Sequence, residues 1–168
     1  MSPLSFAQRR LWLLHRLDPA GALYNATFTL RLRGLADADA LESALADVAH
    51  RHETLRTVFP EVDGEPHQLV LDTVPALDRV SVADEGLRDA MAEASGHEFD
   101  LAAEHPWRPT LFRVSASDHV LLFVMHHIAT DGWSWGPLTR DLATAYTARL
   151  AGQAPDWEPL PVQYADYT

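Results

Sequence analysis

Apolar residues recur at the three- and four-residue spacing of an amphipathic helix in four stretches of the chain. In the second stretch, Leu41, Leu45 and Val48 fall on one helical face. Pro137 lies in the first turn of the last stretch, where a missing amide donor costs little, and Gly152 follows that stretch as its expected C-terminal cap. The predicted helices are residues 5–17, which Asp18-Pro19-Ala20-Gly21 should end, and residues 39–52, 84–99 and 135–150.

Strict alternation of apolar and polar residues predicts a half-buried strand at residues 25–33, where Ala26, Phe28, Leu30 and Leu32 alternate with threonines and arginines. The other predicted strands are 55–62 and 65–71, joined as a hairpin at Asp63-Gly64, then 77–82, 110–115 and 119–127. Because helices and strands interleave, we expect an α+β fold (an α/β sandwich) with helices packed on a mixed β-sheet. The pattern leaves the strand order open.

Polar residues follow abruptly on the most apolar strand. The run 120–125 is continuous in Val, Leu, Phe and Met, which is typical of a strand buried on both faces, and it ends in His126 and His127. Four residues later, Asp131-Gly132 precedes a helix. Side chains alternate across a strand, so one histidine should reach a cleft while the other packs inside.

These residues suit proton transfer. A histidine titrates near neutral pH. Asp131 could orient an imidazole, or hold the loop by pairing with an arginine. The positive end of the following helix dipole favours developing negative charge.

Two other interpretations of the histidine pair stay open at this point. Both His126 and His127 could be structural residues, which is the commoner case for an arbitrary pair. A metal site is disfavoured, because adjacent strand histidines do not easily chelate one ion and the chain has no cysteine to complete a set. The spacing alone therefore indicates an acid–base site and names no reaction.

The amino-acid composition limits which partners the protein can bind and in which cellular compartment it is expected. Among 168 residues, 24 Asp and Glu against 13 Lys and Arg give a formal net charge of −11, which repels nucleic-acid phosphates. The absence of cysteine excludes disulfides and thiolate zinc sites, and is compatible with a reducing cytoplasm. The N-terminus has no secretory signal pattern, and the longest apolar run, 120–125, is too short to span a bilayer. We expect a cytoplasmic protein without nucleic-acid or membrane partners.

Four stretches of the sequence, taken together in their order and spacing, indicate a protein family far more specifically than any one of them does. In order along the chain, they resemble successive motifs of the condensation domains of nonribosomal peptide synthetases. The stretches are SFAQRRLWLL at 5–14, RHETLRTVF at 51–59, MHHIATDGWS at 125–134 with the HHxxxDG core, and YADY at 164–167.

The resemblance implies a fold like that of chloramphenicol acetyltransferase, with two similar lobes and a tunnel between them. Residues 1–153 would form the N-terminal lobe and 154–168 a proline-rich linker toward a missing C-terminal lobe. The isolated lobe is then expected to be inactive, and its exposed apolar face could cause self-association.

The same resemblance implies amide formation between two carrier-bound thioesters, in antibiotic or other secondary-metabolite biosynthesis. The expected partners are donor and acceptor peptidyl carrier protein domains and the missing lobe. The substrates would arrive on 4′-phosphopantetheine arms, with no cofactor bound directly. The opening motif SFAQRRLW is similar to those of the subtype that takes an L-configured donor.

The resemblance also assigns roles to the site residues. His127 matches the functional histidine and would act either as general base or by positioning the amine and stabilising the charged intermediate. His126 is expected to pack beneath it, and Asp131 to hold the loop. Gly132 would allow close backbone approach and could present its amide to the reacting carbonyl. The position of Arg51, His52, Glu53 and Arg56 at a helix end before a strand, rather than the resemblance, predicts structural ion-pair and capping roles for them.

Two alternatives to amide formation remain at this stage. One is an ester-forming or epimerising relative of the same superfamily, which shares variants of the histidine motif. The other is a non-catalytic lobe that binds a carrier protein.

Overall fold

The main sheet has four strands in the order β2-β8-β7-β6, in a computed structural model that describes residues 1–17 and 21–168. β2, β8 and β7 are antiparallel neighbours, whereas β6 runs parallel to β7. The sheet is therefore mixed, as predicted. Its strands are β2 (Asn25–Arg33), β6 (Asp78–Ser81), β7 (Trp107–Ser115) and β8 (Asp118–His126).

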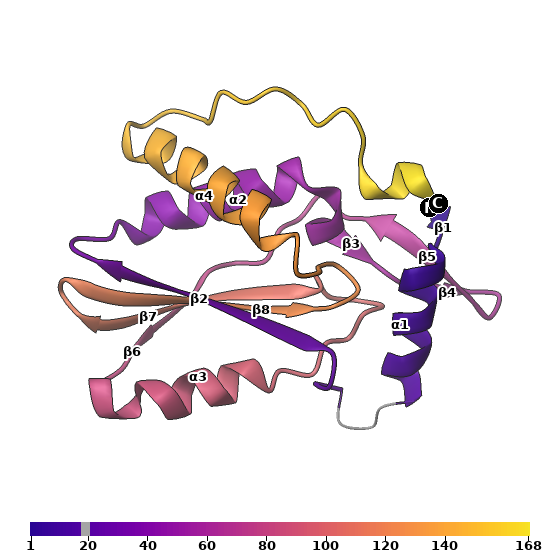
Figure 1. Ribbon diagram of the computed structural model, residues 1–168, viewed down its shortest axis with the longest axis horizontal. Coiled ribbons are helices and arrows are strands. Elements are labelled where there is room, and N and C mark those ends of the chain that lie inside the picture. Colours follow the sequence, from indigo (N-terminus) through magenta and orange to yellow (C-terminus); the bar gives the residue numbers. More distant parts are fainter. Residues whose placement is uncertain (18–20) are drawn as a thin grey trace.

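Helices cover both faces of this sheet. α2 and α4 lie together on one face, α3 lies on the other, and α1 stands beside the end of the sheet at which β8 finishes (Figure 1). The helices are α1 (Phe6–Leu17), α2 (Ala38–Arg51), α3 (Leu87–Ser95) and α4 (Trp135–Leu150). The predicted helix stop at 18–20 lies outside the described residues.

A small second sheet is organised around one strand. β5 (Glu65–Val70) pairs with β1 (Ser2–Pro3), β3 (Thr57–Val58) and β4 (Glu61–Val62). The hairpin turn falls at Asp63 and Gly64 as predicted, with φ of 53° and 83°, the left-handed pair that a type I′ turn needs.

The predicted strand 55–62 begins late in this small sheet. Residues Glu53–Arg56 form a 3-10 turn instead. Arg56 is almost fully buried there and donates hydrogen bonds to the carbonyls of Ala49 and Leu71, which holds the turn between α2 and β5. The hydrogen bonds of the Arg56 side chain thus accompany a 3-10 turn where the apolar residues around it predict a strand.

The core is divided by β8. Leu121, Phe123 and Met125 belong to the cluster that includes the inward faces of α2 and α4. Val120, Leu122 and Val124 belong to the opposite cluster, which includes α3 and reaches part of α1. Because both faces of β8 are covered, its apolar side chains from 120 to 125 are all buried, as the continuous run predicts.

The third predicted helix, 84–99, is too long. Residues Asp84–Gly86 form a 3-10 turn and α3 ends at Ser95. Asn25 Nδ2 donates to the carbonyls of Ser95 (3.1 Å) and His97 (2.8 Å), so a side chain from β2 satisfies helix-end acceptors. A tertiary contact therefore ends this helix before the predicted residue. By contrast, α4 has the predicted bounds, and Gly152 caps it at a φ of 71°.

The fully buried side chain of helix α1 is a glutamine, whereas its large apolar residues are partly buried or exposed. Phe6, Leu13 and Leu17, whose spacing predicts the helix, are exposed, while Gln8 is 2% exposed. Ser5 and Gln8 form a capping box: Gln8 Oε1 accepts from the Ser5 amide, and Ser5 Oγ accepts from the Gln8 amide. Gln8 Nε2 also donates to Gln68 Oε1 at 2.9 Å, so the box attaches α1 to β5.

The C-terminal segment, residues 154–168, lies along the lobe as extended chain that ends in a 3-10 turn at Tyr164–Tyr167. It runs from the end of α4 back past α2 to the N-terminal strand (Figure 1). Arg51 donates to the Glu158 carbonyl at 2.6 Å and stacks over the Trp157 ring at 4.8 Å. Gln163 bonds the backbone of Arg51 and Glu53. The segment therefore packs on the lobe, while the division at 153/154 stays a prediction.

None of the helices within residues 1–17 and 21–168 is long and apolar enough to cross a bilayer.

We expect Gln8→Ala to lower the free energy of unfolding by roughly 1–3 kcal/mol, because it leaves the Ser5 amide and Gln68 Oε1 without their partners in a buried setting. Urea denaturation of the 168-residue chain measures the effect. Gln153→Ala, at an exposed position, is the control and should change stability by less than about 0.5 kcal/mol. Equal effects of the two variants would contradict the buried-box explanation.

Candidate functional site

The two histidines at the end of β8 lie in different environments. His126 is the last residue of the strand and is fully buried, whereas His127 begins a turn and is exposed. The backbone amide of His127 donates to the Tyr24 carbonyl at 2.9 Å, and the Ala129 amide donates to the His126 carbonyl at 3.0 Å. The turn is thus held between β2 and β8, which share the sheet.

His126 supports the turn from below. Its Nδ1 accepts a hydrogen bond from the Ile128 amide at 3.1 Å, so the proton of the neutral ring lies on Nε2. Burial first, and then the nearby His15 and His127, whose positive charge would repel a second one, together lower the pKa of His126 to about 4. The ring is therefore neutral at physiological pH.

The other nitrogen of His126 lies against α1. The His15 ring packs at a right angle to the His126 ring, with centroids 5.1 Å apart. His126 Nε2 and His15 Nδ1 are both buried and have no hydrogen-bond partner among the described residues. The edge-on contact places α1 directly behind the histidine turn.

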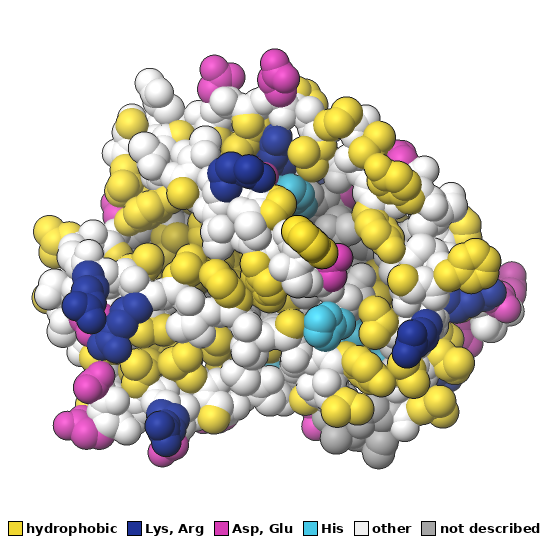
Figure 2. All heavy atoms as spheres, viewed as in Figure 1, with side chains coloured by type: hydrophobic (Ala, Val, Ile, Leu, Met, Phe, Trp, Pro, Cys, Tyr) yellow, Lys and Arg dark blue, Asp and Glu magenta, His cyan; other side chains and the backbone are white. Residues whose placement is uncertain are grey.

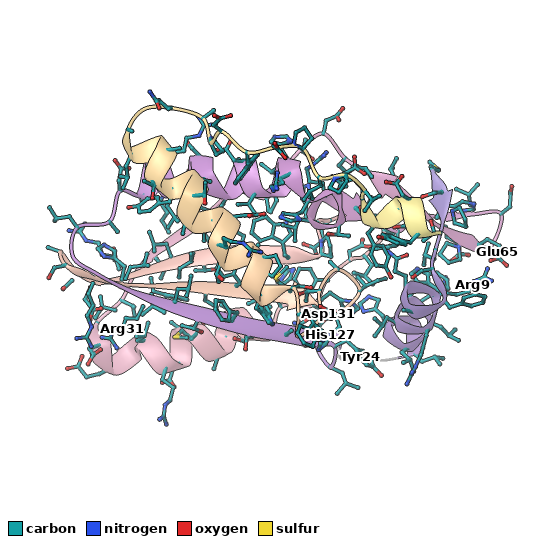
Figure 3. The ribbon with its side chains drawn as sticks, turned by 45° about the horizontal axis from the view of Figure 1, so that its top comes forward. Arg9, Tyr24, Arg31, Glu65, His127 and Asp131 are labelled. Carbon is teal, nitrogen blue, oxygen red and sulfur yellow. The ribbon has the colours of Figure 1, made fainter. Side chains whose placement is uncertain are left out.

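His127 is oriented by its own loop. Its Nδ1 lies 3.3 Å from the Thr130 carbonyl oxygen, which can only accept, so Nδ1 carries the proton in this bond. The neutral ring then has its lone pair on Nε2, the form that a general base requires. His127 lies beside Tyr24 and Asp131 at the start of α4 (Figure 3).

Asp131 is bonded within the loop. Its Oδ1 accepts from the Ser134 hydroxyl (2.6 Å) and from the amides of Ser134 (3.0 Å) and Trp133 (3.1 Å). The Ser134 hydroxyl bond, ahead of the amide bonds, holds the pKa of Asp131 below its usual value. No arginine bonds Asp131 in the part of the chain that the structure describes, so the arginine pairing allowed by the sequence is absent here.

Gly132 is exposed beside Asp131, and a Cβ at this position would meet no atom within 4 Å. Nothing within the described lobe therefore requires a glycine here. Its expected close approach to a reacting carbonyl concerns a substrate and stays a prediction.

A groove of about 790 Å³ opens at His127. Its walls come from α1, the 23–24 segment, the histidine turn and the C-terminal segment. Figure 2 shows hydrophobic side chains gathered on the α1 side of the molecule around this hollow. The apolar lining residues are Ala7, Leu11, Leu23, Ile128, Ala129, Leu160 and Val162, and the others include Gln8, His52, Thr54, Thr130, Gln163, Tyr164 and Tyr167.

The second motif contributes mainly structure. Arg51 Nε and His52 Nε2 both contact Asp141 Oδ2 of α4, at 3.0 and 2.8 Å. With the buried Arg56 described above, these contacts bear out the structural roles expected for the motif, apart from Glu53, whose backbone rather than side chain makes the bonds. His52 also lines the groove.

Sequence reasoning missed one wall of the site. Residues 160–167 have no helical or strand periodicity, and the YADY motif was the one signal that could have pointed to them. Tyr24 acts through its backbone carbonyl, which no side-chain pattern reveals.

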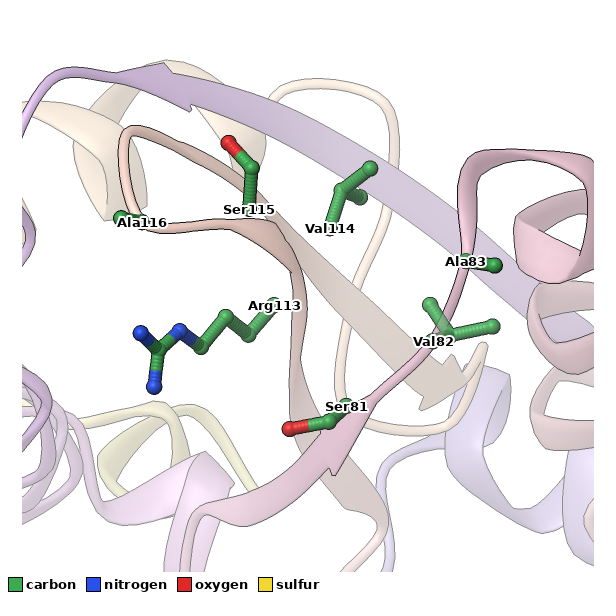
Figure 4. Close-up of a pocket in the computed structure, with 7 residues that line it drawn as sticks. All are labelled: Ser81, Val82, Ala83, Arg113, Val114, Ser115 and Ala116. Atoms are coloured by element: carbon green, nitrogen blue, oxygen red, sulfur yellow. The ribbon is translucent and has the colours of Figure 1, made fainter.

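A second depression lies far from the histidines. It measures about 400 Å³ and is formed by the end of β6 and the β7–β8 turn, including Ser81, Arg113 and Ser115 (Figure 4). The length of β8, roughly 26 Å at strand rise, separates it from the histidine turn. No set of three or more potential metal-ligating side chains converges within the described ranges.

The sequence matches the condensation-domain family over residues 1–168. It is 55% identical over 172 residues to the isonitrile lipopeptide synthase of Mycobacterium tuberculosis, covering 99% of this chain and 7% of that protein. The chain therefore belongs to the condensation-domain family of nonribosomal peptide synthetases, and it spans a small part of the synthases that it matches.

Solved structures agree with this assignment. The chain superposes on the X-domain in a complex with OxyB from teicoplanin biosynthesis with a TM-score of 0.94 and 45% identity, covering 99% of this chain and 36% of that one. The starter condensation domain of the rhizomide synthetase RzmA gives a TM-score of 0.85 at 22% identity, over 94% and 40% of the two chains. The predicted fold, an α+β lobe of the chloramphenicol acetyltransferase type, is confirmed.

We expect the stability of the chain to fall by up to about 3 kcal/mol as the pH is lowered from 7 to 4, through His126 alone. The unfolded chain takes up a proton near pH 6.5, whereas folded His126 resists it until about pH 4, so the unfolded state binds more protons between these values. This contribution is complete above 6.5 and is lost as the pH falls to 4.

The matched variant is His126→Asn, whose Oδ1 replaces Nδ1 as acceptor for the Ile128 amide and does not titrate. Urea unfolding at a series of pH values should give a shallower pH dependence for the variant, whatever its stability at pH 7. Parallel curves for the two proteins would show that His126 is not the titrating group.

Proposed function

We propose that this lobe supplies the histidine of a site that forms an amide bond between two carrier-bound thioesters, a donor acyl group and an acceptor aminoacyl group. The observation that carries the proposal is the orientation of His127, whose Nδ1 is bonded to the Thr130 carbonyl while the side chain is exposed at the groove. Membership of the condensation family supports the same reaction.

The bond formed is between the acceptor nitrogen and the donor carbonyl carbon, and the bond broken is the donor's carbon–sulfur bond. The attacking nitrogen must lose a proton, and the departing thiolate must gain one. His127 Nε2 has the lone pair to take the first proton and could return it to the sulfur. In the alternative role, His127 holds the amine in place and stabilises the charged tetrahedral intermediate.

The loop after His127 would assist electrostatically. Asp131 bonds the amides of Trp133 and Ser134 and so fixes the start of α4, whose positive dipole end lies beside the turn. In this proposal Asp131 is a positioning residue and His126 supports the turn from below. The Gly132 amide, on the same loop, is the candidate donor to the developing oxyanion.

The proposed partners are donor and acceptor peptidyl carrier proteins, which bring the substrates on 4′-phosphopantetheine, and the second lobe of the domain. A lobe alone provides one wall of the reaction chamber, so activity is proposed for the two-lobed domain. The exposed apolar residues of α1, Phe6, Leu13 and Leu17, form a surface where the lobe could self-associate in isolation.

A binding role without turnover is the second candidate, in which the lobe docks a carrier or another protein. One observation favours it: the likeness to the X-domain that was solved in complex with OxyB. Loss of turnover on removal of His127 would separate the two, because a purely binding domain does not depend on that imidazole for chemistry.

In the chain extended to the two-lobed domain, we expect His127→Ala to lower the rate of amide formation by about 100- to 10,000-fold, the usual contribution of a general acid–base group. Intact-protein mass spectrometry of two loaded carrier proteins measures the product. His50→Ala, at an exposed histidine outside the groove, is the control and should retain the rate. An undiminished rate for His127→Ala would overturn the proposal.

The same assay distinguishes the two roles of His127. If the histidine acts as a base, His127→Ala should lower the rate of amide formation less for an acceptor amine that is already unprotonated at neutral pH. A positioning role should give the same loss for acceptors of either basicity. An ester as product with a hydroxyl acceptor would identify the ester-forming relative instead.

A further inference from the structure

We propose that Leu160 and Val162 of the C-terminal segment determine the size of the substrate side chain that the groove accepts. This inference rests on the proposed function, because it assigns a specificity role at the same site. The juxtaposition that carries it is one groove lined by His127 and by both of these residues.

Leu160 and Val162 are presented by a stiff piece of chain. Pro159 and Pro161 alternate with them, and a proline ring fixes φ near −65°, which reduces the conformations available to the segment. In an extended chain, residues two apart point to the same side. Both side chains line the groove, in agreement with that spacing.

The segment is anchored on both sides of these two residues. Before them, Glu158 and Trp157 are held by Arg51, which is itself bonded to Asp141 of α4. These contacts fix the segment against α2 and α4. The position of Leu160 is therefore set by the folded lobe.

After them, Gln163 accepts from the Glu53 amide at 3.1 Å and donates to the Arg51 carbonyl at 3.0 Å. Gln163 and Asp166 form a capping box, and the hydroxyls of Tyr164 and Ser5 share a hydrogen bond of 2.9 Å. The last of these contacts joins the segment to the start of α1. The wall is thus preformed, which is what discrimination by size requires.

The chemistry of the groove fits an apolar side chain. Leu11 and Leu23 contribute apolar surface from other walls, while His127 and Thr130 provide the polar groups. A substrate carbonyl at His127 would leave its side chain among the apolar residues. In such a pocket one methylene group changes kcat/KM by roughly tenfold or more, so a change in the volume of Val162 is large enough to measure.

The test uses the two-lobed domain with two carrier-bound substrates, alanyl and leucyl, compared first as donors and then as acceptors. Val162→Phe fills the groove and should lower kcat/KM for the leucyl substrate roughly tenfold or more on one of the two sides, with less than about threefold change for alanyl. Leu160→Ala enlarges the groove and should shift the preference toward the larger group, raising the leucyl-to-alanyl ratio of kcat/KM on the same side.

Leu35→Ala is the control, because Leu35 is an exposed leucine (92%) outside the groove. Val162 is 46% exposed, so substitutions there are compatible with folding, and Val162→Ala repeats the test without added bulk. Leucyl-to-alanyl ratios within about threefold of the unaltered domain, for every variant and on both sides, would overturn this inference while leaving amide formation intact. Absence of any amide from the unaltered domain would overturn the proposed function, and this inference with it.

Discussion

Helices cover strand β8 on both faces, and the site depends on how the hydrogen bonds of this buried strand are completed at its last residue, His126. The backbone amides and carbonyls of a buried strand, including those of its last residue, must all be hydrogen-bonded. At His126 the backbone amide donates to the Pro106 carbonyl, the carbonyl accepts from Ala129, and the ring accepts from Ile128. These bonds close the strand and form the turn, so the position of His127 follows from the sheet.

Two adjacent residues of the same type consequently have different chemistry. Burial keeps His126 neutral and makes it a fixed acceptor, whereas His127 stays exposed and keeps a nitrogen available at the groove. The end of the strand explains the division, because His126 is the last residue of a strand that is covered on both faces, whereas His127 lies in the turn that follows. The sequence pattern predicted this division, although it could not tell the neutral histidine from the available one.

Elements with local signals could be predicted, and those decided by distant contacts could not. The alternation in β2 and the apolar stripe of α4 gave those elements their observed bounds. The end of α3 depends on Asn25, and the burial of Gln8 depends on Gln68, sixty positions away in sequence. At Asp131 the pattern allowed an arginine partner, but the nearby Ser134 satisfies the carboxylate.

The groove also couples the two ends of the described chain. Pro3 and Thr168 both accept hydrogen bonds from Gln68 Nε2, and Ser5 meets Tyr164. The wall contributed by residues 160–167 is joined both to the N-terminal segment, through Tyr164, and to the end of α2, through Gln163. Gln163 bonds Glu53 and Arg51 across 110 and 112 residues of sequence, so no local pattern could indicate this wall. His127 is held separately, by the Tyr24 and Thr130 carbonyls, so the groove combines walls that different sets of hydrogen bonds position.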